Sequence, residues 1–168
     1  ADAPLSRVSA HYVVAETGEI YALVPEEHRA WHAGVSSWEG DGDVNARSIG
    51  IEIVNGGHDF DLPEFPAAQI DSVISLLGDI FERWPQLNAK RVVAHSDIAP
   101  ARKADPGEKF PWKRLAEAGV SIWPEHVAVL LSSDDPISDV QQQLAFIGYP
   151  VTQTGYMDEP TKAALIAF

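Results

Sequence analysis

The sequence has no cysteine among its 168 residues. Disulfide bonds, a thiolate nucleophile and a cysteine-based metal site are therefore excluded, and any metal ion must be held by His, Asp or Glu. Basic residues are scarce as well, with 12 Lys and Arg against 25 Asp and Glu and a net charge of −13. Because nucleic acids and anionic membrane surfaces are bound through clustered positive charge, this balance argues against both partners. No stretch approaches the roughly 18 apolar residues of a transmembrane helix.

The order of the predicted elements indicates a mixed α/β fold. Residues 10–24 are rich in strand-forming side chains on both sides of a glycine-containing turn, which predicts a β-hairpin. Residues 48–54 alternate between isoleucine and small or polar side chains, as expected of a strand. Apolar residues at helical spacing predict a helix over residues 66–84, and a short helix is expected at 112–118. Since residues 91–94 should add a short central strand, we expect a central mixed β-sheet flanked by helices.

The C-terminal part of the sequence has a different pattern. Residues 126–168 carry no strand signal, and apolar side chains at helical spacing predict helices over residues 137–147 and 158–168. We therefore predict an α/β domain over residues 1–124 and a small all-α module over residues 126–168. The last predicted helix ends on apolar residues that have no partner in the sequence, so we expect this module to be partial.

The densest group of residues with catalytic potential lies between residues 95 and 107. His95 follows a predicted buried strand and so enters the region where sheet proteins bind ligands. Asp105 precedes a proline, which favours extended backbone, so its side chain shares a face with that of Lys103. An imidazole nitrogen and a carboxylate oxygen can bind zinc, and a nearby ammonium group can stabilise an oxyanion. The same residues also fit a structural histidine beside a surface ion pair.

Glu52 is the charged residue of a strand that is otherwise apolar or small. Its carboxylate either faces solvent at a sheet edge or points into a cavity. In a cavity, desolvation would raise the pKa of Glu52 and suit the carboxylate to accept a proton from water near neutral pH. Gly50 lies on the same face of the strand, and its missing side chain favours the cavity because it leaves room for a ligand.

The remaining histidines are weaker candidates. Trp31 and His32 precede a glycine-rich loop. Either the two residues form one wall of a binding site, or Trp31 belongs to the core and His32 caps the loop. His11 lies in the first predicted strand and is expected to be packed and hydrogen-bonded rather than a metal ligand. Three histidines without a partner pattern are expected at the surface: His28, His58 and His126.

Three separate blocks of the sequence match a known family. The blocks are Arg29-Ala30-Trp31-His32-Ala33-Gly34, Asn45 followed by Ser48-Ile49-Gly50-Ile51-Glu52, and His95-x-Asp97-Ile98-Ala99-Pro100-x-Arg102-Lys103-x-Asp105-Pro106-Gly107. In this order and spacing, from about residue 5 to residue 124, they resemble the type 2 N-acetylmuramoyl-L-alanine amidases. Those proteins are zinc enzymes that share their fold with the peptidoglycan-recognition proteins.

The resemblance implies a reaction and a role for each matching residue. The reaction is zinc-dependent hydrolysis of the amide that joins N-acetylmuramic acid to L-alanine in peptidoglycan or muropeptides. By position, His95 and Asp105 would be the zinc ligands. Glu52 would be the general base, and Lys103 would stabilise the oxyanion. The residues expected along the substrate groove are Trp31, His32, Ala33 and Asn45.

The chain departs from the family pattern in its zinc ligands. The third ligand of the family is a histidine on an early strand, upstream of the segment that matches residues 9–12, and residues 1–8 contain no histidine. Catalytic zinc normally has three protein ligands. We therefore expect that the chain lacks its first strand and that a separate N-terminal fragment supplies the third zinc ligand; otherwise the chain is metal-poor and inactive.

Residues 126–168 resemble the start of a helical peptidoglycan-binding module, on the basis of Gly148-Tyr149 and residues 155–164. Amidases with such a module are similar to the periplasmic branch that is associated with the outer membrane, so a location in the bacterial cell envelope is expected. Two alternatives stay open. One is a non-catalytic protein of the same fold that binds peptidoglycan or muropeptides, and the other is a zinc hydrolase that acts on a different amide.

Overall fold

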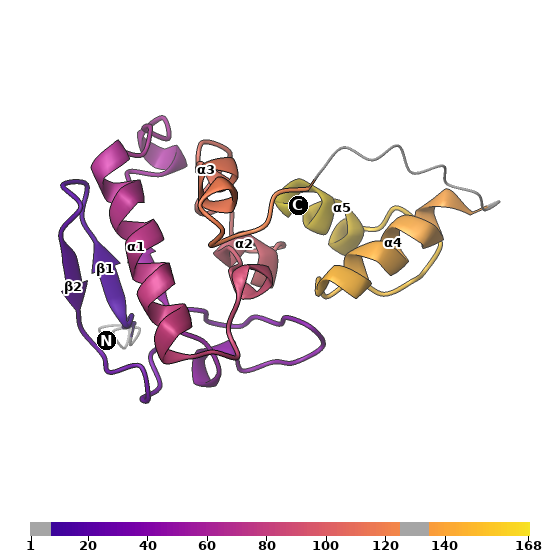
Figure 1. The fold of residues 1–168 in the computed structure, drawn as a ribbon. Coiled ribbons are helices and arrows are strands. Elements are labelled where there is room, and N and C mark those ends of the chain that lie inside the picture. The colour runs from indigo at the N-terminus through magenta and orange to yellow at the C-terminus, as the bar shows by residue number, and fades with distance from the viewer. Residues whose placement is uncertain (1–7, 125–134) are drawn as a thin grey trace, which may run out of the picture.

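A three-stranded sheet forms the N-terminal part of the protein. The structure, a computed structural model, describes residues 8–124 and 135–168 (Figure 1). Strand β1 (Tyr12–Val14) lies in the middle, in the order β2-β1-β3. It pairs antiparallel with β2 (Ile20–Ala22) and parallel with β3 (Ile51–Ile53). The predicted hairpin and the predicted strand within residues 48–54 are therefore confirmed, and β3 is an edge strand among the described residues.

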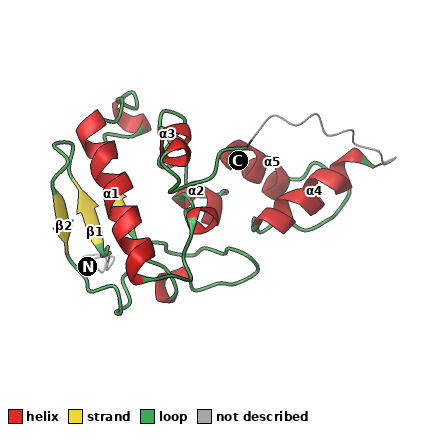
Figure 2. Cartoon of the chain, in the orientation of Figure 1, coloured by secondary structure: helices red, strands yellow, loops and turns green. Residues whose placement is uncertain are grey.

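The long helix α1 (Ala67–Arg83) lies alongside the strands (Figure 2). At its first turn, the buried Gln69 amide donates hydrogen bonds to the carbonyl groups of Val14 at 3.1 Å and Val54 at 2.7 Å, which ties the helix to the ends of β1 and β3. The apolar face of α1 completes the main core, and burying each large side chain there contributes roughly 1.5–3 kcal/mol. The buried residues of this core are Val14, Ile70, Val73, Leu76, Leu77, Ile80, Phe110, Leu115 and Val120.

The prediction of a strand over residues 91–94 is wrong. The structure has a 3-10 turn at Ala89–Arg91, and the rest of this segment pairs with none of the described strands. The N–H of Val92 donates to the first carbonyl of the turn at 3.5 Å, and the N–H of Ala94 donates to the Asp97 carboxylate at 2.6 Å. These two backbone N–H groups therefore bond to atoms nearby in the sequence and not to a neighbouring strand.

Short helical segments connect the rest of the α/β part. Helix α2 (His95–Ile98) follows the turn just described, and α3 (Trp112–Glu117) confirms the predicted short helix. Two further 3-10 turns lie at Val44–Ala46 and His58–Phe60. Within residues 8–124 and 135–168, no helix is both long and apolar enough to cross a lipid bilayer.

Two helices, α4 (Pro136–Ile147) and α5 (Glu159–Ala167), form the C-terminal part, as predicted. The N-terminus of α5 is capped by Asp158, whose carboxylate accepts a hydrogen bond from the Thr161 N–H at 3.0 Å. Gln141 of α4 is fully buried and bonds the α4–α5 loop and Thr161. That the two helices belong to a peptidoglycan-binding module stays a prediction.

Candidate active site

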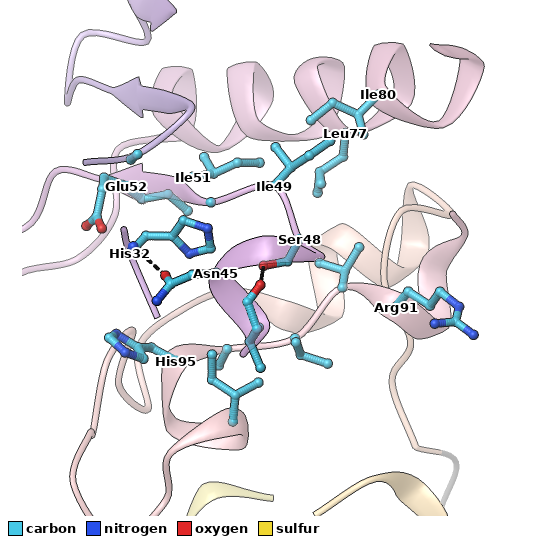
Figure 3. A pocket seen from close by; sticks show the side chains of 18 of the residues that line it. His32, Asn45, Ser48, Ile49, Ile51, Glu52, Leu77, Ile80, Arg91 and His95 are labelled. Carbon is cyan, nitrogen blue, oxygen red and sulfur yellow. Dashed lines mark hydrogen bonds between the residues drawn. The ribbon is translucent and has the colours of Figure 1, made fainter. Parts of the chain in front are cut away.

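A pocket of about 1100 Å³ runs along β3 toward the start of α2. One side of the pocket is apolar and comes from β3 and α1, and the other carries polar and ionisable groups (Figure 3). All the predicted site residues except Ala33 line it: Trp31, His32, Asn45, Glu52, His95, Lys103 and Asp105. The fold therefore brings together residues that are far apart in the sequence.

His95 and Asp105 are in direct contact. His95 is the first residue of α2, and its Nδ1 lies 3.0 Å from Asp105 Oδ2. Its other nitrogen, Nε2, lies 3.1 Å from the carbonyl oxygen of Ala33. Both ring nitrogens thus face oxygen atoms that accept hydrogen bonds, and the hydrogen bond to Asp105 uses a proton on Nδ1 that a bound metal ion would replace.

The charge on Asp105 is favoured by its neighbours. The hydrogen bond with His95 lowers the pKa of the Asp105 carboxyl below its ordinary value, and the charge of Lys103 acts in the same direction. Lys103 Nζ lies 4.0 Å from Asp105 Oδ1, so the two side chains share a face of the loop, as predicted. A carboxylate that stays ionised at neutral pH is suited to bind a cation.

Glu52 has features of both alternatives that its sequence context left open. It lies on the edge strand β3, where it is exposed to solvent, and it also lines the pocket. Figure 3 shows its carboxylate on the same side of β3 as His32. The carboxylate is therefore placed at the open side of the pocket rather than enclosed by it.

The expectation that Gly50 leaves room for a ligand is wrong. A Cβ at Gly50 would lie 2.3 Å from Cγ of His32, so the imidazole already fills this space. The His32 ring also contacts the His11 ring edge-to-face, with the centroids 5.5 Å apart. Burial lowers the pKa of His32 to about 4, with smaller contributions from His11 and His95, so His32 is neutral at physiological pH.

Asn45 holds the backbone of the predicted groove. It is buried, and its Oδ1 accepts hydrogen bonds from the backbone N–H groups of His32 at 2.9 Å and Ala33 at 2.8 Å. The side chain of Ala33 is buried too, and its carbonyl is the part that acts in the site. These two residues shape the pocket through the main chain.

Trp31 forms an exposed wall at the rim of the pocket, which agrees with the binding-wall interpretation and not with the core interpretation. Its side chain is 47% exposed, and the Arg29 guanidinium lies 4.1 Å above the ring centroid. Arg29 is held by two hydrogen bonds to Asp43, of 2.9 and 2.6 Å. The guanidinium of Arg29 thus stacks on one face of the Trp31 indole and holds the ring in place by a cation–π contact.

Arg102 is a site residue to which the sequence analysis gave no role. Its Nη2 donates to the carbonyl of Ala33 at 2.8 Å and to that of Val35 at 3.0 Å, so it joins the groove loop to the loop that carries Lys103. The signal in the sequence was an arginine inside the third motif block. The pattern alone does not show that its partners are carbonyl groups 69 and 67 residues away.

The other histidines are mostly where they were predicted. His11 is fully buried, accepts a hydrogen bond from the Gly50 N–H at Nδ1 and contacts the His28 carbonyl through Nε2 at 3.0 Å, so it is a packed residue as expected. His28 and His58 are exposed, as predicted. His126 lies outside the described residues.

The His95–Asp105 pair suits a zinc ion but does not complete a site by itself. Its two facing atoms are both zinc donors, and metal-binding histidines usually donate their other N–H to a carbonyl or carboxylate, as His95 does to Ala33. Within the described residues, no group of three His, Cys, Asp or Glu side chains could hold a metal ion. The pair therefore offers two candidate ligands where catalytic zinc normally has three.

Comparison with known proteins agrees with this geometry. Residues 1–108 match the family model described as N-acetylmuramoyl-L-alanine amidase (Amidase_2). The chain belongs to this amidase family. The N-acetylmuramoyl-L-alanine amidase AmiD of Escherichia coli K12 is 43% identical over 131 residues, which cover 71% of this chain and 47% of AmiD. The putative amidase RC0497 of Rickettsia conorii is 33% identical over 176 residues, 95% of this chain and 64% of that protein. The chain thus spans about half to two thirds of these relatives' lengths.

Solved amidase structures share the fold. The complex of E. coli AmiD with the substrate anhydro-N-acetylmuramic acid-L-Ala-D-gamma-Glu-L-Lys superposes with a TM-score of 0.81 at 35% identity and covers 97% of this chain and 70% of AmiD. AmpDh3 of Pseudomonas aeruginosa, in complex with an anhydromuramic pentapeptide, gives a TM-score of 0.77 at 33% identity and covers 96% and 81% of the two chains. The predicted family and the α/β fold class are confirmed.

Proposed function

We propose that this protein hydrolyses the amide bond between N-acetylmuramic acid and L-alanine in peptidoglycan or muropeptides, with zinc as its cofactor. The observation that carries the proposal is the 3.0 Å contact between His95 Nδ1 and Asp105 Oδ2, in a pocket that Glu52 and Lys103 also line. Membership of the amidase family supports the choice of the bond that is cut.

His95 and Asp105 would hold the zinc ion with the two atoms that face each other. When bound, zinc supplies Lewis acidity, which makes an amide carbonyl more electrophilic and a water molecule more acidic. With zinc on Nδ1, the other ring nitrogen of His95, Nε2, would donate its N–H to the Ala33 carbonyl oxygen, which lies 3.1 Å away.

Glu52 and Lys103 would move the proton and stabilise the charge. Glu52 accepts a proton from water as the water oxygen bonds to the carbonyl carbon, and then donates that proton to the L-alanine nitrogen as the C–N bond breaks. Lys103 donates a hydrogen bond to the carbonyl oxygen while negative charge develops there. The exposed position of Glu52 on β3 leaves it accessible to water and to the departing amine.

The substrate class follows from the exposed rim and from the relatives. The AmiD and AmpDh3 complexes contain anhydro-muramyl peptides, and we propose the same class of muropeptide for this pocket. The indole of Trp31 would stack against the sugar, because aromatic faces bind the apolar face of a pyranose ring. Arg102 and Asn45 support this wall by fixing the backbone behind it.

The third zinc ligand would come from a separate N-terminal fragment. The pocket has an apolar side beneath β3, lined by Ile49 and Ile51 of the β3 segment and by Leu77 and Ile80 of α1 (Figure 3). A segment with apolar side chains would contact the partly buried Ile49 and Ile51 there and bring a histidine toward His95. We also propose that the protein lies in the periplasm, associated with the outer membrane, and that its α4–α5 pair is part of a peptidoglycan-binding module.

Replacing Glu52 by Gln tests the mechanism. We expect Glu52→Gln to lower kcat by about 10²–10⁴-fold, the usual contribution of a general base, while the bound zinc per chain stays the same. The measurement is release of free peptide from an anhydro-muropeptide, together with elemental analysis of zinc. The matched control is Glu117→Gln, an exposed carboxylate on α3. Unchanged turnover in Glu52→Gln would remove Glu52 from the mechanism.

The absence of a three-ligand group among the described residues favours a second candidate, a protein of this fold that binds muropeptides without cutting them. This candidate predicts tight binding of an anhydro-muropeptide by calorimetry with no peptide release, even after zinc is added. Release of free peptide by the zinc-loaded protein excludes it.

A further inference from the structure

A partly buried hydrogen bond joins the C-terminal part of the chain to the helix that carries His95. Tyr149 follows the glycine that ends α4 and is 5% exposed. Its hydroxyl donates to Oδ1 of Asp97 at 2.5 Å, although the two residues are 52 positions apart in the sequence. Asp97 lies in α2, two residues after His95. One carboxylate thus links the end of α4 to the helix that carries His95.

The Asp97 carboxylate makes a second bond on the other side. Its Oδ2 accepts the N–H of Ala94, the residue immediately before His95, at 2.6 Å. One oxygen therefore fixes the backbone where the chain enters α2, and the other is held by Tyr149. The carboxylate is partly removed from water and so depends on hydrogen-bond donors for its oxygens. Loss of the Tyr149 hydroxyl removes the donor to Oδ1, frees the carboxylate to rotate and loosens its hydrogen bond with Ala94.

A second contact, through Trp38, reaches the other partner of His95. The Trp38 ring packs edge-to-face on Tyr149, with the centroids 5.3 Å apart, and on the backbone of Gly148. Trp38 also packs against the buried cluster that contains Ala33, whose carbonyl contacts His95 Nε2. The Gly148 carbonyl accepts the N–H of Glu39 at 2.9 Å and fixes this loop to the end of α4.

We propose that Tyr149 is a positioning residue for His95: its hydrogen bond to Asp97 fixes the start of α2 and thereby the orientation of the His95 imidazole. The inference rests on the proposed function only in the assumption that the zinc ligand is His95. It gives the α4–α5 pair a role in the site that does not depend on binding the cell wall.

The test compares Tyr149→Phe with Tyr156→Phe, the same substitution at a 77% exposed tyrosine of the α4–α5 loop. NMR of the full metal-free chain reports the His95 ring nitrogens and the exchange rate of the Ala94 amide hydrogen. We expect Tyr149→Phe to change the His95 ring signals, to speed Ala94 exchange by about tenfold and to weaken zinc binding by about tenfold, the low end for groups that orient a ligand. Tyr156→Phe should change none of the three.

The outcomes separate this inference from the proposed function. A lower melting temperature for Tyr149→Phe with unchanged His95 signals and zinc affinity would mean that Tyr149 is merely structural and would overturn the inference. Changed His95 signals in a protein whose parent form never releases peptide would sustain the inference and reject the amidase proposal. If Tyr149→Phe does not fold, Asp97→Asn replaces it, since one amide oxygen cannot serve both donors and the same changes are expected.

Discussion

The His32 ring fits against residue 50 only because this residue is a glycine and has no Cβ. Any larger side chain would occupy the position of the imidazole, since even a Cβ would lie 2.3 Å from its Cγ. The ring is kept neutral by burial, and its Nε2 is buried with no hydrogen-bond partner among the described residues. His32 is thus a packed, uncharged group between β3 and the pocket, and its position depends on its neighbours rather than on a hydrogen bond from Nε2.

Substituting Gly50 by Ala should displace His32. We expect Gly50→Ala to lower the free energy of unfolding by about 1–3 kcal/mol, the usual cost of an added group in a packed site. The control is Gly78→Ala in α1, where a Cβ meets nothing within 4 Å and should stabilise the helix by about 0.5–1 kcal/mol. Urea unfolding of both variants checks the opposite signs; a neutral Gly50→Ala would show that the ring moves without cost.

The hairpin and α1 are joined by one carboxylate after β2. Glu26 accepts hydrogen bonds from Tyr12 at 2.6 Å, from Trp84 at 2.6 Å and from Arg83 at 2.7 and 3.1 Å. The Arg83 hydrogen bond, with those of Tyr12 and Trp84, lowers the pKa of Glu26 to about 2. Because the carboxylate is ionised in the folded state, it fixes the last turn of α1 against β1.

This network predicts a pH-dependent contribution to stability. The pKa of Glu26 is lower in the folded chain than its ordinary value of 4.5, so its contribution is complete above about pH 4.5 and is lost as the pH falls toward 2. We expect Glu26→Gln to lower the free energy of unfolding by about 1–2 kcal/mol at pH 7, with a difference that shrinks below pH 4. Unfolding curves measured at pH 7 and below pH 4 test this difference, with Glu27→Gln, at an exposed residue, as the control. A difference that is constant with pH would contradict it.

Pattern and propensity were sufficient for elements whose hydrogen bonds are local or whose apolar faces are long. The helical spacing from Ile70 to Trp84 predicted α1 to within about one residue, and the strand formers around Gly18 predicted the hairpin. Residues 91–94 have the composition of a strand, but the Asp97 carboxylate binds the Ala94 N–H and turns the chain into α2. That partner is a side chain, so strand propensity could not reveal it.

The candidate site was predictable in its residue types and less so in its contacts. The imidazole and carboxylate of His95 and Asp105 were expected together, and the structure places them 3.0 Å apart. The space beside Gly50 was assigned to a ligand because nothing in the sequence shows that a ring 18 residues upstream packs there. Contacts that depend on tertiary packing are the part that the sequence pattern does not contain.

Trp38 connects the two parts of the molecule by packing. It belongs to the cluster around Ala33 and Ile98 and to the cluster of α4 and α5 around Leu144 and Tyr149. Its indole nitrogen is buried and makes no hydrogen bond within the described part of the chain. Trp38 therefore stabilises the fold by filling space and burying apolar surface, and not by a hydrogen bond.

Truncating Trp38 should loosen both clusters at once. We expect Trp38→Ala to cost about 3–5 kcal/mol, and Trp38→Phe to cost less than about 1.5 kcal/mol because no indole hydrogen bond is lost. Circular dichroism during denaturant unfolding measures both values. A Trp38→Phe variant as costly as Trp38→Ala would show that the phenyl ring recovers none of the packing, and would contradict this account.

The shared packing of Trp38 also limits how this chain can be recombined with other proteins. A hybrid that joins the α/β part alone to a foreign C-terminal segment exposes the Trp38 ring and removes the Tyr149 hydroxyl from the partly buried Asp97 carboxylate. The contact between the two described parts of the chain therefore includes Trp38 and Tyr149. A successful chimera has to carry matching groups for both, or replace both with residues that close the surface.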